Sequence, residues 1–466
     1  MYRKSGDMSM ILGAFQTMNP NGTVGVSWRD PENTSLDFLT IDYWTDLARR
    51  IEAGGFDFLF FADSYGYPTT ADGETIDRAL IDATNIPMAD PVTLVTAIAA
   101  ATTSLGIVVT SSTQVERAPA VARRYGTLDH LTRGRIGWNI VTGAAQASSA
   151  ALFGEPMMAH DQRYAQAEDH ASICLKLWEG SWEEGALVAD KAAGVYADPA
   201  RVHQIEHRGT HLSAKGLYGV PPGPQRTPFL LQAGTSKAGM DFAARFAELV
   251  FIGGGDTETI RQQIADLRDR LPAAGRSRDA IKFVVGAHFV VGPDEQGALE
   301  RRQRMLQFVT LEQAATTYAW LTGIDLTAFP QDEPLPDLHT EMGQSSVDRY
   351  MNPATGIRKT PREVLTEFRD NGINGTVFVG APERVADEME SFLAYVDADG
   401  FLVQPHITPG TYDDFIDHLV PELRRRGHLG TPEAPTTLRA RMFPEGGDHL
   451  PSTHIGASFR QAAVGS

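Results

Sequence analysis

The sequence predicts an α/β fold in which eight parallel strands close into a (β/α)8 barrel, the TIM-barrel fold. Eight short and mostly continuous apolar runs are spread along the 466 residues. Such runs are typical of strands that helices cover on both sides. Amphipathic stretches with a helical period separate these runs. Periodicity does not distinguish a closed barrel from an open, doubly wound sheet, so the open sheet is kept as the alternative.

The eight predicted strands follow one another along most of the chain. In order they are Met10–Phe15, Phe56–Ala62, Leu105–Thr110, Arg135–Val141, Phe229–Gln232, Leu249–Ile252, Phe283–Val291 and Phe401–Gln404. A ninth apolar run, Thr376–Val379, follows Gly372 at the end of a predicted helix by only four residues. We therefore interpret this run as a loop strand outside the barrel.

Three helices between these strands are marked by apolar stripes at helical spacing. The stripes are Trp44, Leu47, Ala48 and Ile51; Ile260, Ile264, Leu267 and Leu271; and Val385, Met389, Phe392 and Val396. Gly54 and Gly55 end the first helix, and Pro382 suits the first turn of the third.

Long insertions interrupt the pattern after strands two, four and seven. They cover residues 64–90, 180–227 and 293–360, within a single barrel domain spanning residues 1–430. Because long loops in a compact domain usually serve a function, we expect them to build a binding mouth. Residues 431–466 show no helical pattern, and we expect a C-terminal arm packed on the surface or on a partner subunit.

Composition excludes several classes of function. The chain has 41 Lys and Arg against 59 Asp and Glu, a net charge of −18, which disfavours nucleic acids and anionic membranes as partners. No apolar run reaches the length of a membrane span, and the N-terminus lacks a signal-peptide pattern. The only cysteine, Cys174, cannot form an internal disulfide. These features predict a cytoplasmic protein.

Polar side chains stand where three predicted strands end. Asp63 follows the second strand, Thr110 ends the third, and Asn139 and Thr142 end the fourth. Polar residues at successive strand ends are what the mouth of a barrel requires. Residues that form turns would produce a similar pattern, so that reading stays open.

Two further segments are candidates for binding an anion. Gln232-Ala233-Gly234-Thr235-Ser236 joins a strand to a helix, where free backbone N–H groups and hydroxyls can hold a phosphate. An ordinary capped turn explains this segment equally well. His160 and Tyr164 lie four residues apart in a predicted first helical turn, with Asp161 as a possible cap. The alternative there is a surface histidine beside a core tyrosine.

One metal-binding pattern is rejected. His203-Gln204-Ile205-Glu206-His207 matches the H-x-x-E-H motif, which binds zinc only when it lies on a helix. Pro199 precedes it and Gly209 follows it closely, so we predict a β-hairpin and assign no metal.

Four longer stretches resemble the bacterial luciferase-like flavin monooxygenases, and most closely the nitrilotriacetate, EDTA and dibenzothiophene-sulfone monooxygenase branch. The stretches are residues 122–131, 134–142, 190–199 and 232–236. The resemblance extends from about Ile11 to Gly430. The sulfone-cleaving members carry a histidine where this chain has Leu321, and their histidine near the first strand has no counterpart around Thr23–Ser27.

The resemblance implies a barrel that binds reduced FMN at the carboxyl ends of its strands. Asp63, Thr110, Asn139 and Thr142 would surround the isoalloxazine ring and the ribityl chain. His160, Tyr164, Gly234 and Ser236 would hold the phosphate. FMNH2 would react with O2 to form a flavin peroxide, which would oxygenate a small organic substrate. The resemblance implies no protein nucleophile.

The same resemblance implies partners and leaves two alternatives. No NAD(P)H fingerprint is present, which fits a separate NAD(P)H:flavin reductase that delivers FMNH2, and we expect a homo-oligomer, a dimer or tetramer. We expect part of the substrate wall to come from the third insertion, at Trp320, Leu321 and Phe329. Such a wall would suit an aromatic or organosulfur compound, and the expected physiological role is xenobiotic degradation. The alternatives are a deazaflavin-dependent oxidoreductase of the same fold and a non-catalytic flavin-binding protein.

Overall fold

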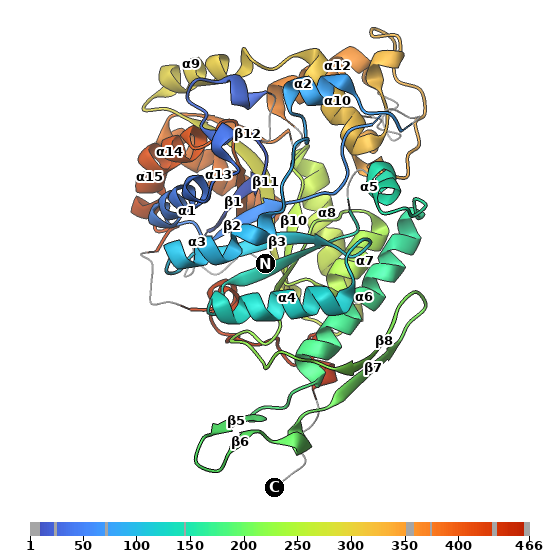
Figure 1. Cartoon of the computed structure of the whole chain (residues 1–466). Coiled ribbons are helices and arrows are strands. Elements are labelled where there is room, and N and C mark those ends of the chain that lie inside the picture. The colour runs from blue at the N-terminus through green and yellow to red at the C-terminus, as the bar shows by residue number, and fades with distance from the viewer. Residues whose placement is uncertain are drawn as a thin grey trace.

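The structure is a computed structural model, and it describes residues 10–22, 26–69, 73–143, 146–350, 358–372, 375–430 and 436–460 (Figure 1). Eight parallel strands form a closed ring. Their bounds are β1 Ile11–Thr17, β2 Phe58–Ala62, β3 Gly106–Ser112, β4 Ile136–Val141, β9 Phe229–Gln232, β10 Leu249–Ile252, β11 Lys282–Val291 and β13 Gly400–Gln404. Each strand pairs with its neighbours in this order, and β13 returns to β1. The predicted barrel is confirmed, and the doubly wound alternative is wrong.

The predicted strand positions agree with the structure to within two residues at every bound. The run expected to be a loop strand is β12, Val377–Gly380, which pairs only with the distal half of β11, from His288 onward. The proximal half of β11 pairs with β13 within the ring. β12 therefore extends the sheet outside the barrel, as predicted.

Helices surround the ring and run antiparallel to the strands (Figure 1). Their bounds are α1 Ile41–Gly54, α3 Val95–Ala101, α4 Ala118–Leu131, α6 His160–Gly180, α7 Lys237–Phe246, α8 Thr257–Arg270, α13 Pro382–Val396, α14 Gly410–Asp414 and α15 Val420–Arg425. The three predicted apolar stripes lie on α1, on α8 with the 3-10 helix that follows it, and on α13, and they are almost entirely buried. Pro382 stands in the first turn of α13, and Gly55 takes the left-handed conformation that ends α1. Short 3-10 helices cover Ser27–Arg29, Ser35–Asp37, Pro91–Leu94, Pro199–Arg201, Leu271–Ala274, Arg278–Ala280, Leu326–Ala328 and Ile455–Phe459, and Phe415–Leu419 is a π-helical turn.

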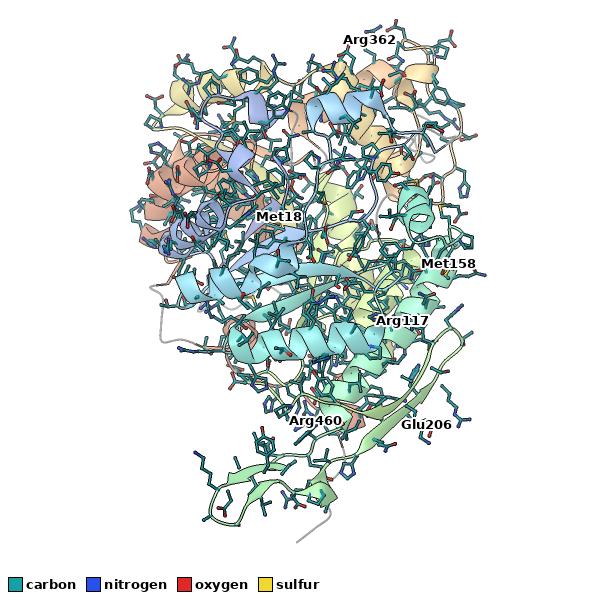
Figure 2. All side chains as sticks on the ribbon, viewed as in Figure 1. Met18, Arg117, Met158, Glu206, Arg362 and Arg460 are labelled. Atoms are coloured by element: carbon teal, nitrogen blue, oxygen red, sulfur yellow. The ribbon has the colours of Figure 1, made fainter. Side chains whose placement is uncertain are left out.

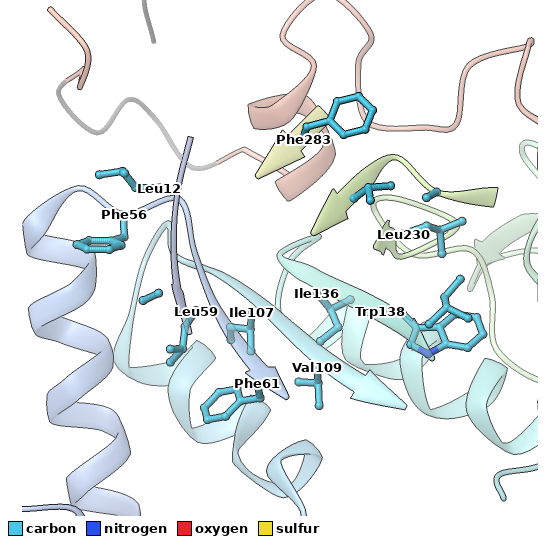
Figure 3. Packing of buried hydrophobic residues seen from close by; sticks show 14 of the residues in the cluster. Leu12, Phe56, Leu59, Phe61, Ile107, Val109, Ile136, Trp138, Leu230 and Phe283 are labelled. Carbon is cyan, nitrogen blue, oxygen red and sulfur yellow. The ribbon is translucent and has the colours of Figure 1, made fainter. Parts of the chain in front are cut away.

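The core has two layers because strand side chains alternate between the lumen and the helices. Toward the helices, Leu59, Phe61 and Ile107 belong to the larger cluster (Figure 3). Toward the lumen, a second cluster includes Phe58, Phe60 and Val108. The barrel interior is therefore a packed core below the cavity.

The first and third insertions meet at one end of the barrel. The first contains α2, Asp77–Asp82, and the third contains α9 Glu295–Leu306, α10 Leu311–Thr322 and α11 Gln344–Asp348, followed by α12 Pro361–Asn371. α10 packs against both α12 and α2, and a short helix after β4, α5 Gln146–Leu152, lies beside them (Figure 1).

The second insertion lies elsewhere. It follows α6 and forms two antiparallel hairpins, β5 Leu187–Asp190 with β6 Val195–Ala197, and β7 Gln204–Arg208 with β8 Ser213–Leu217. Figure 2 shows Glu206 on the hairpin that projects away from the barrel. The expectation that this insertion helps to build the mouth is wrong, because α6 carries the chain to the opposite end before the insertion begins. The β-hairpin predicted for the His203–His207 segment is confirmed.

The C-terminal segment closes the far end of the barrel. Residues 438–442 form a helix, α16 Leu438–Met442, although no helical pattern was recognised there. Leu438 and Met442 pack into the lumen cluster, and Arg439 makes a buried bidentate ion pair with Glu248 at 2.6 and 2.8 Å. Within the described ranges, no helix is long and apolar enough to cross a membrane.

Candidate active site

A cavity of about 430 Å³ opens at the carboxyl ends of the barrel strands. Its walls come from strand ends, from the start of α6, from the turn before α7, and from the first and third insertions. All eight residues predicted to bind the cofactor line it: Asp63, Thr110, Asn139, Thr142, His160, Tyr164, Gly234 and Ser236. The structure therefore brings together side chains that lie up to 173 residues apart in the sequence, from Asp63 to Ser236.

One corner of the cavity is built from the β9–α7 turn. Ser236 is the N-cap of α7, and its hydroxyl accepts a hydrogen bond from the Gly239 N–H at 3.1 Å. A Cβ atom on residue 234 would lie 2.4 Å from Gln232 Nε2 and 2.5 Å from the Tyr164 hydroxyl, so only glycine leaves this space open. A helix start whose remaining first-turn N–H groups lie beside a close-approach glycine is suited to binding an anion.

The start of α6 forms the other side of this corner. Burial raises the pKa of the Tyr164 hydroxyl, while its contacts with Ser236 and Thr142 lower it. The His160 and Tyr164 rings are adjacent, with centroids 5.2 Å apart. The capping role expected of Asp161 is wrong: α6 begins at His160 with Ala159 as its N-cap, and Asp161 Oδ1 lies 2.9 Å from His160 Nδ1 instead. Asp161 lies inside the first turn, too late to cap it.

Strand ends provide polar groups along the cavity. Asn139 Nδ2 donates to the Thr110 hydroxyl at 2.8 Å, and Thr110 donates to the Phe61 carbonyl at 2.8 Å. This chain sets the orientation of the Asn139 amide. The carbonyl oxygens Asn139 Oδ1 and Gln232 Oε1 are buried without a hydrogen-bond partner among the described residues. Unsatisfied buried acceptors at a cavity wall favour a ligand that carries N–H or O–H groups.

Asp63 lies at the same edge in an unusual electrostatic setting. Burial raises the pKa of its carboxyl group to about 7, with further raising by the charges of Asp90 and Glu116. The Ser64 N–H donates to Asp63 Oδ1 at 2.8 Å and opposes this shift. A carboxyl group that titrates near neutrality inside a cavity is typical of a functional site.

An aromatic floor was not predicted from the sequence. Phe15, Phe60 and Phe251 line the cavity from below, with ring centroids 5.5 to 6.4 Å apart. The alternation of Phe58 and Phe60 along β2 could have indicated this, because both point into the lumen. Such a floor suits the flat, apolar part of a ring ligand.

Arg163 was also missed. Its side chain is 2 % exposed and lines the cavity one helical turn after His160. The residue stands within the segment His160–Tyr164, so its helical spacing from His160 was an available signal.

The third insertion contributes the roof. Trp320 and Leu321, predicted to be substrate-wall residues, line the cavity together with Met342 and with Met88 of the first insertion. Phe329, the third predicted wall residue, packs instead against the small apolar cluster around Tyr318 and Leu326. The structure thus brings two of the three residues to the cavity.

The chemistry of this cavity fits an elongated phosphorylated ring compound. It has an anion corner at one end, polar strand ends along its length, an aromatic floor and an apolar roof. Together with the barrel, these features define a TIM-barrel protein with a flavin-type nucleotide site at the strand ends.

Comparison with known proteins specifies the family. Residues 21–397 match the family described as luciferase-like monooxygenase. The dimethyl-sulfide monooxygenase of Hyphomicrobium sulfonivorans is 36 % identical over 98 % of this chain and 95 % of its own. Nitrilotriacetate monooxygenase component A of Aminobacter aminovorans is 34 % identical over 92 % and 97 %. A crystal structure of a riboflavin lyase with modified FMN and riboflavin superposes with a TM-score of 0.91 at 38 % identity, covering 97 % of this chain and 100 % of the other. The chain belongs to the luciferase-like monooxygenase family.

Proposed function

We propose that this protein is an FMNH2- and O2-dependent monooxygenase that oxygenates a small organic substrate. The observation that carries this proposal is the arrangement of the cavity. Its anion corner at Gly234, Ser236 and Tyr164 lies at one end, and an apolar roof with Trp320 and Leu321 covers it. Membership in the luciferase-like monooxygenase family supports this function over deazaflavin-dependent hydride transfer and over simple flavin storage.

The residues of the cavity divide into two groups under this proposal. Thr110, Asn139, Thr142 and Asp63 hold the isoalloxazine ring and the ribityl chain, because they supply hydrogen-bonding groups along the strand ends. His160, Tyr164, Gly234 and Ser236 hold the phosphate. When bound, FMNH2 supplies the electrons and the O2-reactive ring, and the protein binds, orients and shields that ring from water.

The roof serves substrate binding and the exclusion of water. Trp320 and Leu321 come from α10, which rests on α2 of the first insertion, so two insertions jointly cover the mouth. An apolar roof that closes over the cavity keeps water away from the reacting ring. The substrate is a neutral or weakly polar small molecule, with aromatic and organosulfur compounds as the classes to test first.

The proposal also includes a partner protein, a cellular location and a physiological role. A separate NAD(P)H:flavin reductase delivers FMNH2, in keeping with the word "component" in the name of the nitrilotriacetate relative. The protein works in the cytoplasm as a homo-oligomer, and xenobiotic degradation is the physiological role to examine.

The test combines labelled oxygen with a reductase. Purified protein, FMN, NADH and a generic flavin reductase are incubated under 18O2 with a panel of organosulfur and aromatic compounds. We expect a labelled product only when both the reductase and O2 are present. Robust NADH oxidation by the isolated protein with FMN would contradict the two-component arrangement.

A second experiment addresses the deazaflavin alternative. Anaerobic titration compares the affinity for FMNH2 with the affinity for a reduced deazaflavin. We expect tighter binding of FMNH2, and tighter binding than for oxidised FMN. Preference for the deazaflavin would overturn the monooxygenase function.

A further inference from the structure

Arg163 is a buried cation that faces the cavity. Its side chain is 2 % exposed, and it is the only lysine or arginine among the described residues that line the cavity. Burial lowers the pKa of its guanidinium group, with partial compensation from Tyr164 and from the charge of Glu341. A charge in such a position needs a partner, because burying an unpaired cation costs several kcal/mol.

Among the described residues, this guanidinium has one hydrogen-bond partner. Arg163 Nη2 donates to the backbone carbonyl of Glu341 at 2.8 Å, and Nε has no partner among the described residues. The Glu341 carboxylate, the acid that acts on Arg163 electrostatically, accepts from the His160 backbone N–H at 3.2 Å. The guanidinium group of Arg163 therefore has N–H donors available for another group.

The position of Arg163 identifies that group as an oxyanion at the anion corner. Arg163 lies in the first turn of α6, between His160 and Tyr164 in the sequence, and all three line the cavity. The Tyr164 hydroxyl contacts Ser236, the N-cap of α7. A guanidinium group and a helix start that line the same cavity match the two needs of a phosphate monoester, charge and hydrogen bonds.

Glu341 connects this corner to the roof. It precedes Met342, which lines the cavity, and it follows α10 within the third insertion. Two hydrogen bonds, from His160 N–H and from Arg163, join Glu341 to the first turn of α6. The segment 339–343 is thus attached to the same turn that faces the anion.

We infer that Arg163 is the positive charge that pairs with the phosphate of the bound flavin nucleotide, and that it holds segment 339–343 of the roof to that phosphate through the Glu341 carbonyl. The inference rests on the proposed function and extends it by assigning a residue that ties cofactor binding to the roof. Its consequence is specific: FMN should fasten the roof, whereas riboflavin, which lacks the phosphate, should not.

The first test compares FMN with riboflavin in binding. Charge-assisted hydrogen bonds are worth about 1.5–3 kcal/mol, so Arg163→Gln should weaken FMN binding by roughly one to two decades and leave riboflavin binding nearly unchanged. Arg163→Lys keeps the charge without the fork and should lose less. Arg245→Gln is the matched control, since Arg245 on α7 pairs with Glu168 of α6 and does not line the cavity.

The second test follows the roof by limited proteolysis with thermolysin, mapping cuts within residues 335–345. Saturating FMN should slow cleavage of the wild-type roof about tenfold, and saturating riboflavin should not. In Arg163→Gln the protection by FMN should be lost even at saturation, whereas Glu341→Ala, which keeps the carbonyl, should retain the FMN preference in binding.

The outcomes separate this inference from the proposed function. If wild-type protein binds FMN no more tightly than riboflavin, the phosphate site itself is misassigned and the proposed function fails with it. If wild-type protein prefers FMN and both Arg163 variants keep that preference, only the pairing of Arg163 with the phosphate is overturned. If FMN binding weakens in Arg163→Gln but its roof remains protected by saturating FMN, the connection through Glu341 is overturned.

Discussion

The Tyr164 hydroxyl lies 2.5 Å from the point that a Cβ atom on residue 234 would occupy. Gly234 and Tyr164 therefore share one small space in the anion corner, between the start of α6 and the turn before α7. Gln232 Nε2 borders the same space at 2.4 Å. A methyl group there would displace both side chains at the corner proposed to hold the phosphate.

Gly234→Ala should therefore weaken FMN binding more than it weakens the fold. The neighbouring atoms are the ends of flexible side chains, so they can move without disturbing the barrel. We expect a loss of at least tenfold in FMN affinity, measured by fluorescence titration, with a melting temperature within a few degrees of wild type. Unchanged affinity would show that ligand and residue 234 do not meet.

Removing the side chains proposed to hold the phosphate should distinguish FMN from riboflavin. His160→Ala, Tyr164→Phe and Ser236→Ala each remove one hydrogen bond to a charged group, worth about 1.5–3 kcal/mol. Each variant should lose roughly one to two decades of FMN affinity while riboflavin binding hardly changes. Equal losses for both ligands would move the phosphate site elsewhere. Lys237→Ala, an exposed position next to the Ser236 cap, serves as the control.

Asp63 should make the stability of the flavin-free protein depend on pH. Its pKa is about 7 in the folded protein, against an ordinary value near 4, so between these pH values the folded state binds a proton that the unfolded state has lost. Stability from this group is present at low pH and is lost as pH rises through 7. The urea midpoint of Asp63→Asn should therefore increase relative to that of the wild type as the pH rises from 5 to 8. A constant difference across this range would mean that Asp63 is ionised throughout.

The barrel strands could be predicted because each is a short apolar run with turn residues at its ends. Burial on both faces makes such runs continuous, and the structure places their bounds within two residues of the prediction. Periodicity alone did not exclude an open sheet, because closure depends on β10 pairing with β11 and β13 pairing with β1, contacts that leave no periodic signal. The closed barrel was predicted from the number of strands with intervening helices.

The site was predictable where a residue follows a strand directly. Thr110, Asn139 and Gly234 end or follow strands whose positions were recognised, so the barrel geometry carries them to the cavity. Phe251 was missed because an inward-facing strand residue has the same local sequence pattern as any core residue. Arg163 was missed because a cation on a helix has the same local pattern as a surface residue. The helix α16 in the C-terminal arm was not predicted, because the burial of Leu438 and Arg439 comes from the barrel end that they close.

The roof should control substrate choice and the coupling of oxygen use to product. Trp320 and Leu321 line the cavity, and they come from α10, which packs against α12 and against α2 of the first insertion. Trp320→Ala opens the roof, and Leu321→His places a polar ring in it. Both changes admit water next to the reduced flavin, while the anion corner is untouched.

We therefore expect FMNH2 affinity near the wild-type value in both variants, with altered substrate preference and several-fold more hydrogen peroxide released per NADH consumed. Phe329→Ala provides the matched control, because Phe329 belongs to the same insertion but packs in the cluster around Tyr318 and Leu326. Peroxide release is measured with the reductase present, with and without an accepted substrate. If Trp320→Ala and Leu321→His leave coupling and substrate range unchanged, the roof takes no part in the reaction. If Phe329→Ala shifts them as strongly, the effect comes from the packing of the insertion and not from the cavity wall.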